Sequence, residues 1–187
     1  MDTLILKRHF IDQPVPMGDV NKTDMQPQIS FIEFFINDRP LSTLLDEFYA
    51  SKHINTLKNN IGVLGSFGNL PIEIIKVKQL LGKRCIPEDF EEVRELLTRT
   101  IDKDRVNDII DTIKDELSEP GTMVYCCAQC GDYLCGGVNV NILIDENYVK
   151  WAFGEEAEIL EFVFNKYAYL ETMKAYLNKI KMSLSKQ

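Results

Sequence analysis

Residues 136–153 read GGVNVNILIDENYVKWAF, a pattern typical of a β-hairpin. Every second residue of its first half is apolar, and such alternation places these side chains on one face of a half-buried strand. The alternating apolar residues are Val138, Val140, Ile142 and Ile144. Residues 145–147 supply the turn and residues 148–153 the return strand, in which Trp151 is expected to anchor the core. An antiparallel sheet is therefore expected at the centre of the fold.

Three segments outside this hairpin also predict strands. Residues 29–36, ISFIEFFI, are rich in aromatic and β-branched side chains, which favour strands. Residues 123–127 read as a strand, and residues 3–7 as a short edge strand. Residues 37–40 supply a turn after the first of these strands.

Helices are predicted between and after the strands. Ser42 or Thr43 is expected to cap a short helix that ends near Tyr49. Another helix is expected to begin at Pro87, because proline and acidic residues favour the first turn. A third has one apolar stripe at helical spacing, formed by Val106, Ile109, Ile110, Ile113 and Leu117. Residues 72–81 fit either a strand or a helix.

The C-terminal part of the chain predicts one long helix over residues 155–184, released by Gly154. Phe162, Tyr169 and Tyr176 repeat at intervals of seven along it, and core packing is the expected role of this strip. A partner-binding role for the aromatic strip is the alternative.

These elements predict an α+β fold, with an antiparallel β-sheet, helices packed mainly on one face and a long C-terminal helix. Residues 1–187 are expected to form a single domain that carries residues 87–120 as an acidic helical insertion. No apolar run approaches the roughly 18–20 residues that a bilayer requires. The N-terminus also lacks the apolar core of a signal peptide, so we expect a soluble, cytoplasmic protein.

The net charge of −8 is concentrated in one stretch of the chain. Residues 87–120 carry 12 acidic and 5 basic side chains, a local charge of −7. This balance argues against nucleic-acid binding, which needs clustered Lys and Arg. It favours a surface that docks a basic protein partner, although a solvated helix face is the simpler alternative. The candidate partner-binding residues are Asp104, Asp108, Asp111, Asp115 and Glu116.

Four of the five cysteines lie within residues 126–135, CCAQCGDYLC. Cys127 and Cys130 are spaced like one half of a zinc site, and Cys135 could supply a third ligand. Cys126 is a poor fourth ligand, because neighbours on a strand point to opposite faces. The favoured alternative is structural: reduced cysteines pack as small apolar side chains beneath a tight turn. A redox pair would need a helix N-terminus to lower the thiol pKa.

No motif in the chain carries recognisable catalytic chemistry. Gly62, Gly65 and Gly68 are spaced G-x-x-G-x-x-G, which matches neither the dinucleotide fingerprint nor the Walker loop. The chain has two histidines and no triad spacing. We therefore expect a protein that is not an enzyme and needs no cofactor.

The cysteine segment resembles a bacterial family of uncharacterised proteins. Family members read C-x-E-C-G-D-x-G-C-G after a strand, and residues 127–136 read CAQCGDYLCG, with Gln129 and Leu134 as departures. Residues 32–41 and 62–65 also resemble the family. Val149, Trp151 and Phe153 are similar to its V-x-W-x-x-F hairpin, with the phenylalanine one position early. Some family members are labelled oxidoreductases.

The overall character of the chain is similar to immunity proteins of bacterial toxin systems, including contact-dependent growth inhibition. This resemblance implies a tight one-to-one complex with a cognate basic toxin domain, often a nuclease. The leading hypothesis is a non-enzymatic immunity protein that occludes the toxin's active site, with its acidic residues mimicking phosphates or pairing with Lys and Arg. A zinc-stabilised intracellular binding module and a cysteine-dependent redox protein are the alternatives.

Overall fold

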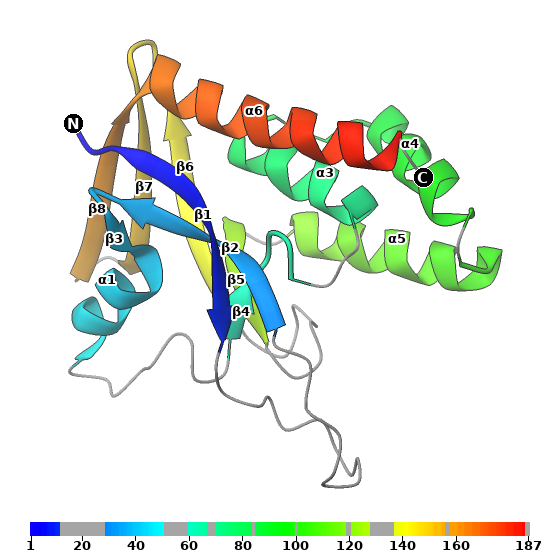
Figure 1. Cartoon of the computed structure of the whole chain (residues 1–187), viewed down its shortest axis with the longest axis horizontal. Helices are drawn as coiled ribbons and strands as arrows, with labels where there is room; N and C mark the ends of the chain where they lie inside the picture. Colours follow the sequence, from blue (N-terminus) through cyan, green and yellow to red (C-terminus); the bar gives the residue numbers. More distant parts are fainter. Residues whose placement is uncertain are drawn as a thin grey trace, which may run out of the picture. The chain divides into compact units, whose positions relative to one another are not determined.

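The computed structural model describes residues 1–11, 29–50, 60–66, 70–83, 85–99, 101–118, 121–127, 137–155 and 158–185. Within these ranges the chain forms helices and antiparallel strand pairs and ends in a long helix. The predicted α+β class is therefore confirmed. Figure 1 shows the described elements along the chain.

The chain divides into two compact units, each assembled from separated segments. Unit 1 contains residues 69–122 and 140–187 together with Met1, and unit 2 contains residues 2–68 and 123–139. One strand, β6 (Gly137–Ile144), begins in unit 2 and continues in unit 1. That residues 1–187 form a single domain, which the sequence predicts, stays a prediction.

Unit 2 is built around an antiparallel sheet in which β2 is the middle strand. Its strands are β1 (Leu4–Ile11), β2 (Ile29–Ile36) and β3 (Arg39–Pro40). The bounds of β2 match the prediction, and β1 extends four residues beyond the predicted 3–7. Asn37 and Asp38 have φ values of 50° and 63° and form a two-residue turn between β2 and β3. Such left-handed backbone suits Asn and Asp in a tight hairpin.

The short helix α1 (Leu41–Phe48) follows β3 directly. Its N-cap is Pro40, and no side chain caps it. The predicted cap at Ser42 or Thr43 is therefore wrong. Ser42 lies inside the first turn with only 3% of its surface exposed, and it hydrogen-bonds inward to the Glu33 carboxyl instead of to the start of its own helix.

A glycine-containing segment joins the two sheets of unit 2. β4 (Asn60–Gly62) pairs with β5 (Thr122–Cys127). Two residues further on, the Leu64 carbonyl accepts a hydrogen bond of 2.6 Å from the backbone of Ile32 in β2. At Gly62 an added Cβ would lie 2.3 Å from Cδ2 of Phe31. This glycine therefore serves close packing between the sheets; Gly68 lies outside the described residues.

Unit 1 contains the predicted hairpin, extended by a further strand. β6 pairs with β7 (Tyr148–Glu155), and β7 pairs with β8 (Glu158–Asn165). Val149, Trp151 and Phe153 are buried on one face of β7, as expected for the anchor of the core.

The predicted helix over residues 155–184 is wrong in its first part, because β8 occupies residues 158–165. Phe162 and Phe164 are buried, Val163 between them is only half-buried, and Glu161 and Asn165 on either side are exposed, which is the two-residue period of a strand. The helix α6 (Lys166–Leu184) starts only after Asn165, whose side chain accepts a 3.1 Å hydrogen bond from the amide of Ala168. Phe162 thus belongs to the sheet. Tyr169 is buried on α6 and Tyr176 lies partly buried.

Three further helices complete unit 1. They are α3 (Leu70–Leu80), α4 (Pro87–Leu97) and α5 (Lys103–Ser118), so the segment 72–81, left open above, is helical as far as Leu80. α4 begins at Pro87 as predicted, with the Asp89 carboxylate accepting a 3.0 Å hydrogen bond from the amide of Ile86. α6 runs along α3 and packs against β7 and β8 (Figure 1). None of the described helices is both long enough and apolar enough to cross a bilayer.

Candidate functional site

The predicted partner-binding aspartates lie in one row on α5. Asp104, Asp108, Asp111 and Asp115 follow one another at intervals of four, three and four residues, which keeps them on one helix face. All four side chains are exposed. Glu116 comes one residue after Asp115, and its position is therefore turned by about 100° around the helix. The structure thus places four of the five predicted residues together, over a length of ~17 Å along the axis.

The opposite face of α5 holds the helix in unit 1. Its predicted apolar stripe is buried against α3 and α4, and Ile109 and Leu117 border the same core. The buried members of this core are Ile75, Val93, Leu97, Val106, Ile110 and Ile113. Arg94 of α4 also hydrogen-bonds the side chain of Asn107 on α5. These contacts fix the acidic row on a rigid support, which favours a binding surface over a mobile tail.

The acidic residues of α4 are engaged within unit 1. Asp89 forms an ion pair with Lys78, and both side chains are nearly buried. Glu92 lies 3.5 Å from Lys78 and 3.0 Å from Lys181. Burial alone would raise the pKa of Asp89, but the hydrogen bonds from Lys78 and the Ile86 amide outweigh it and lower that pKa. Asp89 and Glu92 of α4 therefore link this helix to α3 and α6 through ion pairs.

The remaining acidic residues show a further difference between α4 and α5 in how many of them form ion pairs. Glu91 and Glu95 of α4 pair with Arg94 and Arg99 at 3.3 and 3.4 Å. On α5, Asp111 pairs with Lys114 at 3.0 Å. Within the described part of the chain, Asp104 and Asp108 take part in no ion pair. The exposed row of α5 is thus the less neutralised of the two acidic surfaces.

The cysteine motif is described only at its start. Cys126 is buried in β5 with its Sγ 3.7 Å from the carbonyl oxygen of Ile61, and Cys127 beside it is buried as well. Cys130 and Cys135 lie outside the described residues, so the zinc set Cys127, Cys130 and Cys135 stays a prediction. Among the described residues no group of three His, Cys, Asp or Glu side chains could hold a metal ion. Cys85, predicted to lie in the core, is half-buried at its border.

One polar cluster was missed by the sequence analysis. Glu33 lies in the middle of β2 with no exposed surface, and its Oε1 accepts hydrogen bonds from the hydroxyl of Tyr125 and, at 2.9 Å, from the amide of Phe34. Burial raises the pKa of Glu33 to about 7, although the bonds from Tyr125 and Ser42 oppose this shift. The sequence signal that could have revealed this cluster is the single acidic residue, Glu33, within the apolar strand-forming segment 29–36.

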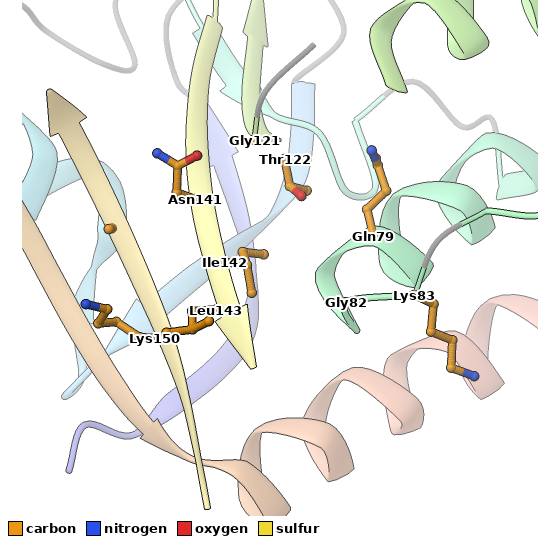
Figure 2. Close-up of a pocket in the computed structure, with 10 residues that line it drawn as sticks. Gln79, Gly82, Lys83, Gly121, Thr122, Asn141, Ile142, Leu143 and Lys150 are labelled. Atoms are coloured by element: carbon orange, nitrogen blue, oxygen red, sulfur yellow. The ribbon is translucent and has the colours of Figure 1, made fainter. Parts of the chain in front are cut away.

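Unit 1 also contains a hollow of about 520 Å³ beside β6. In Figure 2 the side chains of Gln79, Thr122 and Ile142 border it, whereas the amino groups of Lys83 and Lys150 point away. Lys150 instead pairs with Glu161 at 2.9 Å. The Oε1 atom of Gln79 is buried and accepts no hydrogen bond within the described residues. The described lining of the hollow therefore offers it neutral polar and apolar groups.

Comparison with known proteins identifies no relative from which a role could be transferred. No protein-family model, no curated protein and no solved structure matches this chain.

Proposed function

We propose that this chain is a non-enzymatic inhibitor, an immunity protein that binds a cognate bacterial toxin domain through the acidic row of α5. The row consists of Asp104, Asp108, Asp111 and Asp115, and Glu116 follows it in the next position of the helix. In this proposal the protein acts in the bacterial cytoplasm, and the row covers basic residues in or beside the active site of the toxin.

The observation that carries this proposal is the contrast between the two acidic helices. Asp89, Glu91, Glu92 and Glu95 of α4 pair with lysines and arginines of unit 1. In the exposed row of α5, Asp104 and Asp108 take part in no ion pair within the described chain, and the other face of this helix is fixed in a core. Neutralised acids stabilise a fold, and a line of exposed acids on a rigid element is a source of field for a basic partner.

Such a row suits an inhibitor of an enzyme that acts on phosphates. A nuclease binds its substrate through lysine and arginine side chains, and a fixed line of carboxylates presents them with a similar series of negative charges. Rim charges of this kind act mainly on the association rate and its salt dependence. A fast association rate is useful to an immunity protein, because the toxin must be bound before it acts.

The test is affinity capture from the native host, with the intact protein as bait. The paired variant Asp104→Asn with Asp108→Asn removes two charges of the row that take part in no ion pair in the described chain. We expect a stoichiometric basic toxin domain to bind the natural protein, and to bind this variant at least about tenfold more weakly at low salt.

A matched control removes the same charge from α4. Glu91→Gln with Glu95→Gln lies on exposed surface of the same unit and should leave capture and its salt dependence unchanged. Equal weakening by the two variants would show that only the net charge matters. Capture that neither variant affects would exclude the acidic row as the binding surface.

A further inference from the structure

β1 is the end strand of its sheet in unit 2. It pairs with β2 on one side, in an unbroken register from Leu4 opposite Ile36 to Ile11 opposite Ile29. Its eight residues contain no proline, and no bulge interrupts the pairing. Natural edge strands are usually shortened, bulged or broken by proline, since a straight edge can pair with another chain. β1 has none of these three protections.

The register shows which backbone groups face the open side. The carbonyl of Thr3 accepts a 3.1 Å hydrogen bond from the amide of Asn37, so position 3 bonds toward β2. Because bonding alternates along an antiparallel pair, the odd positions of β1 bond to β2 and the even positions point away from it. The even positions are Leu4, Leu6, Arg8 and Phe10.

A bond on the far side of β2 supports this assignment. Ile32 is the register partner of Arg8, and the same alternation turns its amide away from β1. That amide donates to Leu64, on the opposite edge of β2. The described residues therefore leave a row of four N–H and C=O pairs along β1 for another strand.

The side chains along this edge are basic at the centre and apolar toward the ends. Lys7 and Arg8 are exposed, and Arg8 donates a 3.0 Å hydrogen bond to the hydroxyl of Ser30. Lys7 lies 4.4 Å above the ring of Phe35 and 3.7 Å from Asp38. Ile5 and Phe10, on either side, are 41% and 49% exposed. The contacts of the two cations hold them in place beside the edge.

We propose that the outer edge of β1 binds an extended acidic segment of a partner protein, which adds to the sheet as a further strand. Carboxylates near the centre of the added strand lie opposite Lys7 and Arg8, and apolar residues at its ends cover Ile5 and Phe10. Strand addition gains affinity from the backbone groups and specificity from the side chains. A second copy of this chain fits less well, because two-fold pairing centred on β1 sets either Lys7 opposite Lys7 or Arg8 opposite Arg8 of the other copy.

Two model peptides test this proposal on the intact ¹⁵N-labelled protein. The acidic probe is acetyl-Thr-Val-Glu-Glu-Val-Thr-amide, and its matched control carries Lys-Lys in place of Glu-Glu. The acidic peptide should slow hydrogen exchange at the amides of Leu6, Arg8 and Phe10 and leave those of Ile5 and His9, already bonded to β2, unchanged. It should bind at least about fivefold more tightly than the control at low salt.

A charge-reversed protein supplies the reciprocal measurement. Lys7→Glu with Arg8→Glu should exchange the preference, so that the Lys-Lys peptide binds more tightly. If that variant fails to fold, Lys7→Gln with Arg8→Gln should remove the preference.

Three results would overturn the proposal. One is equal binding of the two peptides, and another is protection of the even amides in dilute protein without peptide, since the chain itself would then cover the edge. The third is protection that grows with protein concentration alone, which would identify a second copy as the occupant.

Discussion

The hydroxyl of Tyr125 donates a hydrogen bond to Oε1 of Glu33, and both residues are fully buried although 92 positions separate them. The bond connects β2 to β5, and Ser42 of α1 hydrogen-bonds the same carboxyl. Burial raises the pKa of Tyr125 as well, and the neighbouring Glu33 carboxyl raises it further. The pair is therefore a polar contact within unit 2 whose charge depends on pH.

The stability of unit 2 is expected to decrease between pH 5 and pH 8. The folded-state pKa of Glu33, about 7, lies above its ordinary value of 4.5, so the folded state binds the proton more tightly. The stabilisation is fully present below pH 4.5 and is lost as pH rises through 7, by ~3 kcal/mol. Glu33→Gln should flatten this dependence, as measured by urea unfolding with hydrogen exchange of the β2 amides. The exposed Glu47→Gln serves as control, and an unchanged slope in Glu33→Gln would refute the assignment.

Unit 1 should show the opposite dependence at acid pH. Lys78 joins Asp89 and Glu92 across α3 and α4, and the pKa values of both carboxyls are lowered below their ordinary 3.8 and 4.5. Their stabilisation is present above those values and is lost as pH falls through the folded-state pKa values. Lys78→Ala should lower the free energy of unfolding by about 2 kcal/mol, between the cost of breaking an exposed pair and a buried pair.

A charge pair on α5 provides the control for this variant. Lys114 pairs with Asp111 on exposed surface, so Lys114→Ala should cost less than about 0.5 kcal/mol. Acid unfolding followed by the fluorescence of Trp151, the only tryptophan, reports on unit 1. Equal stability of the two variants would mean that burial adds nothing to the Lys78 contact.

Removal of the Tyr169 hydroxyl should destabilise unit 1 by about 2 kcal/mol or more. Trp151 Nε1 donates to this hydroxyl at 3.2 Å, and the hydroxyl donates to the carbonyl of Leu80 at 2.6 Å. Tyr169→Phe leaves the buried Trp151 N–H and the Leu80 carbonyl without the hydroxyl that each bonds, and an unsatisfied buried group costs about 1–3 kcal/mol. Tyr167→Phe removes the same atom from a side chain that is 73% exposed and should be neutral. Thermal unfolding followed by tryptophan fluorescence compares the two.

An alanine at Gly62 should destabilise unit 2 by about 1–3 kcal/mol through overpacking. Its Cβ would lie 2.3 Å from Phe31, which is buried between the sheets and cannot easily move. Phe31→Leu should recover part of this loss in the double variant, giving a favourable coupling energy in urea unfolding. Additive losses would show that Phe31 is not the obstacle.

The sequence was most informative where local pattern and tertiary role coincide. Residues 29–36 combine strand-forming side chains with a tight turn, and the structure has a strand with the same bounds. The stripe on α5 predicted both its buried face and, opposite, the row from Asp104 to Asp115. The proposed partner of that row is untested, because a pattern of charge specifies a surface and not its ligand.

Prediction from the sequence failed where a helical and a strand period overlap, and where two residues in contact lie far apart in the sequence. Residues 158–165 precede a true helix, and counting Phe162 with Tyr169 at a spacing of seven carried the helical period into a strand. The two-residue period of Phe162 and Phe164 prevails there, because the segment pairs with β7 along its whole length. Glu33 could be noticed as an acid in an apolar run, but its partner could not, because the spacing to Tyr125 follows no local period.

The interleaved segments of the two units determine when each can fold during synthesis. Unit 2 needs residues 123–139, so the first strands leave the ribosome long before the strand that supplies Tyr125. The helices α3, α4 and α5 lie close together in the sequence and share one core, so they can form while β2 still lacks that strand. The outer edge of β1 is open during this wait, as it is among the described residues of the folded chain, and the charges of Lys7 and Arg8 at its centre oppose edge-to-edge aggregation.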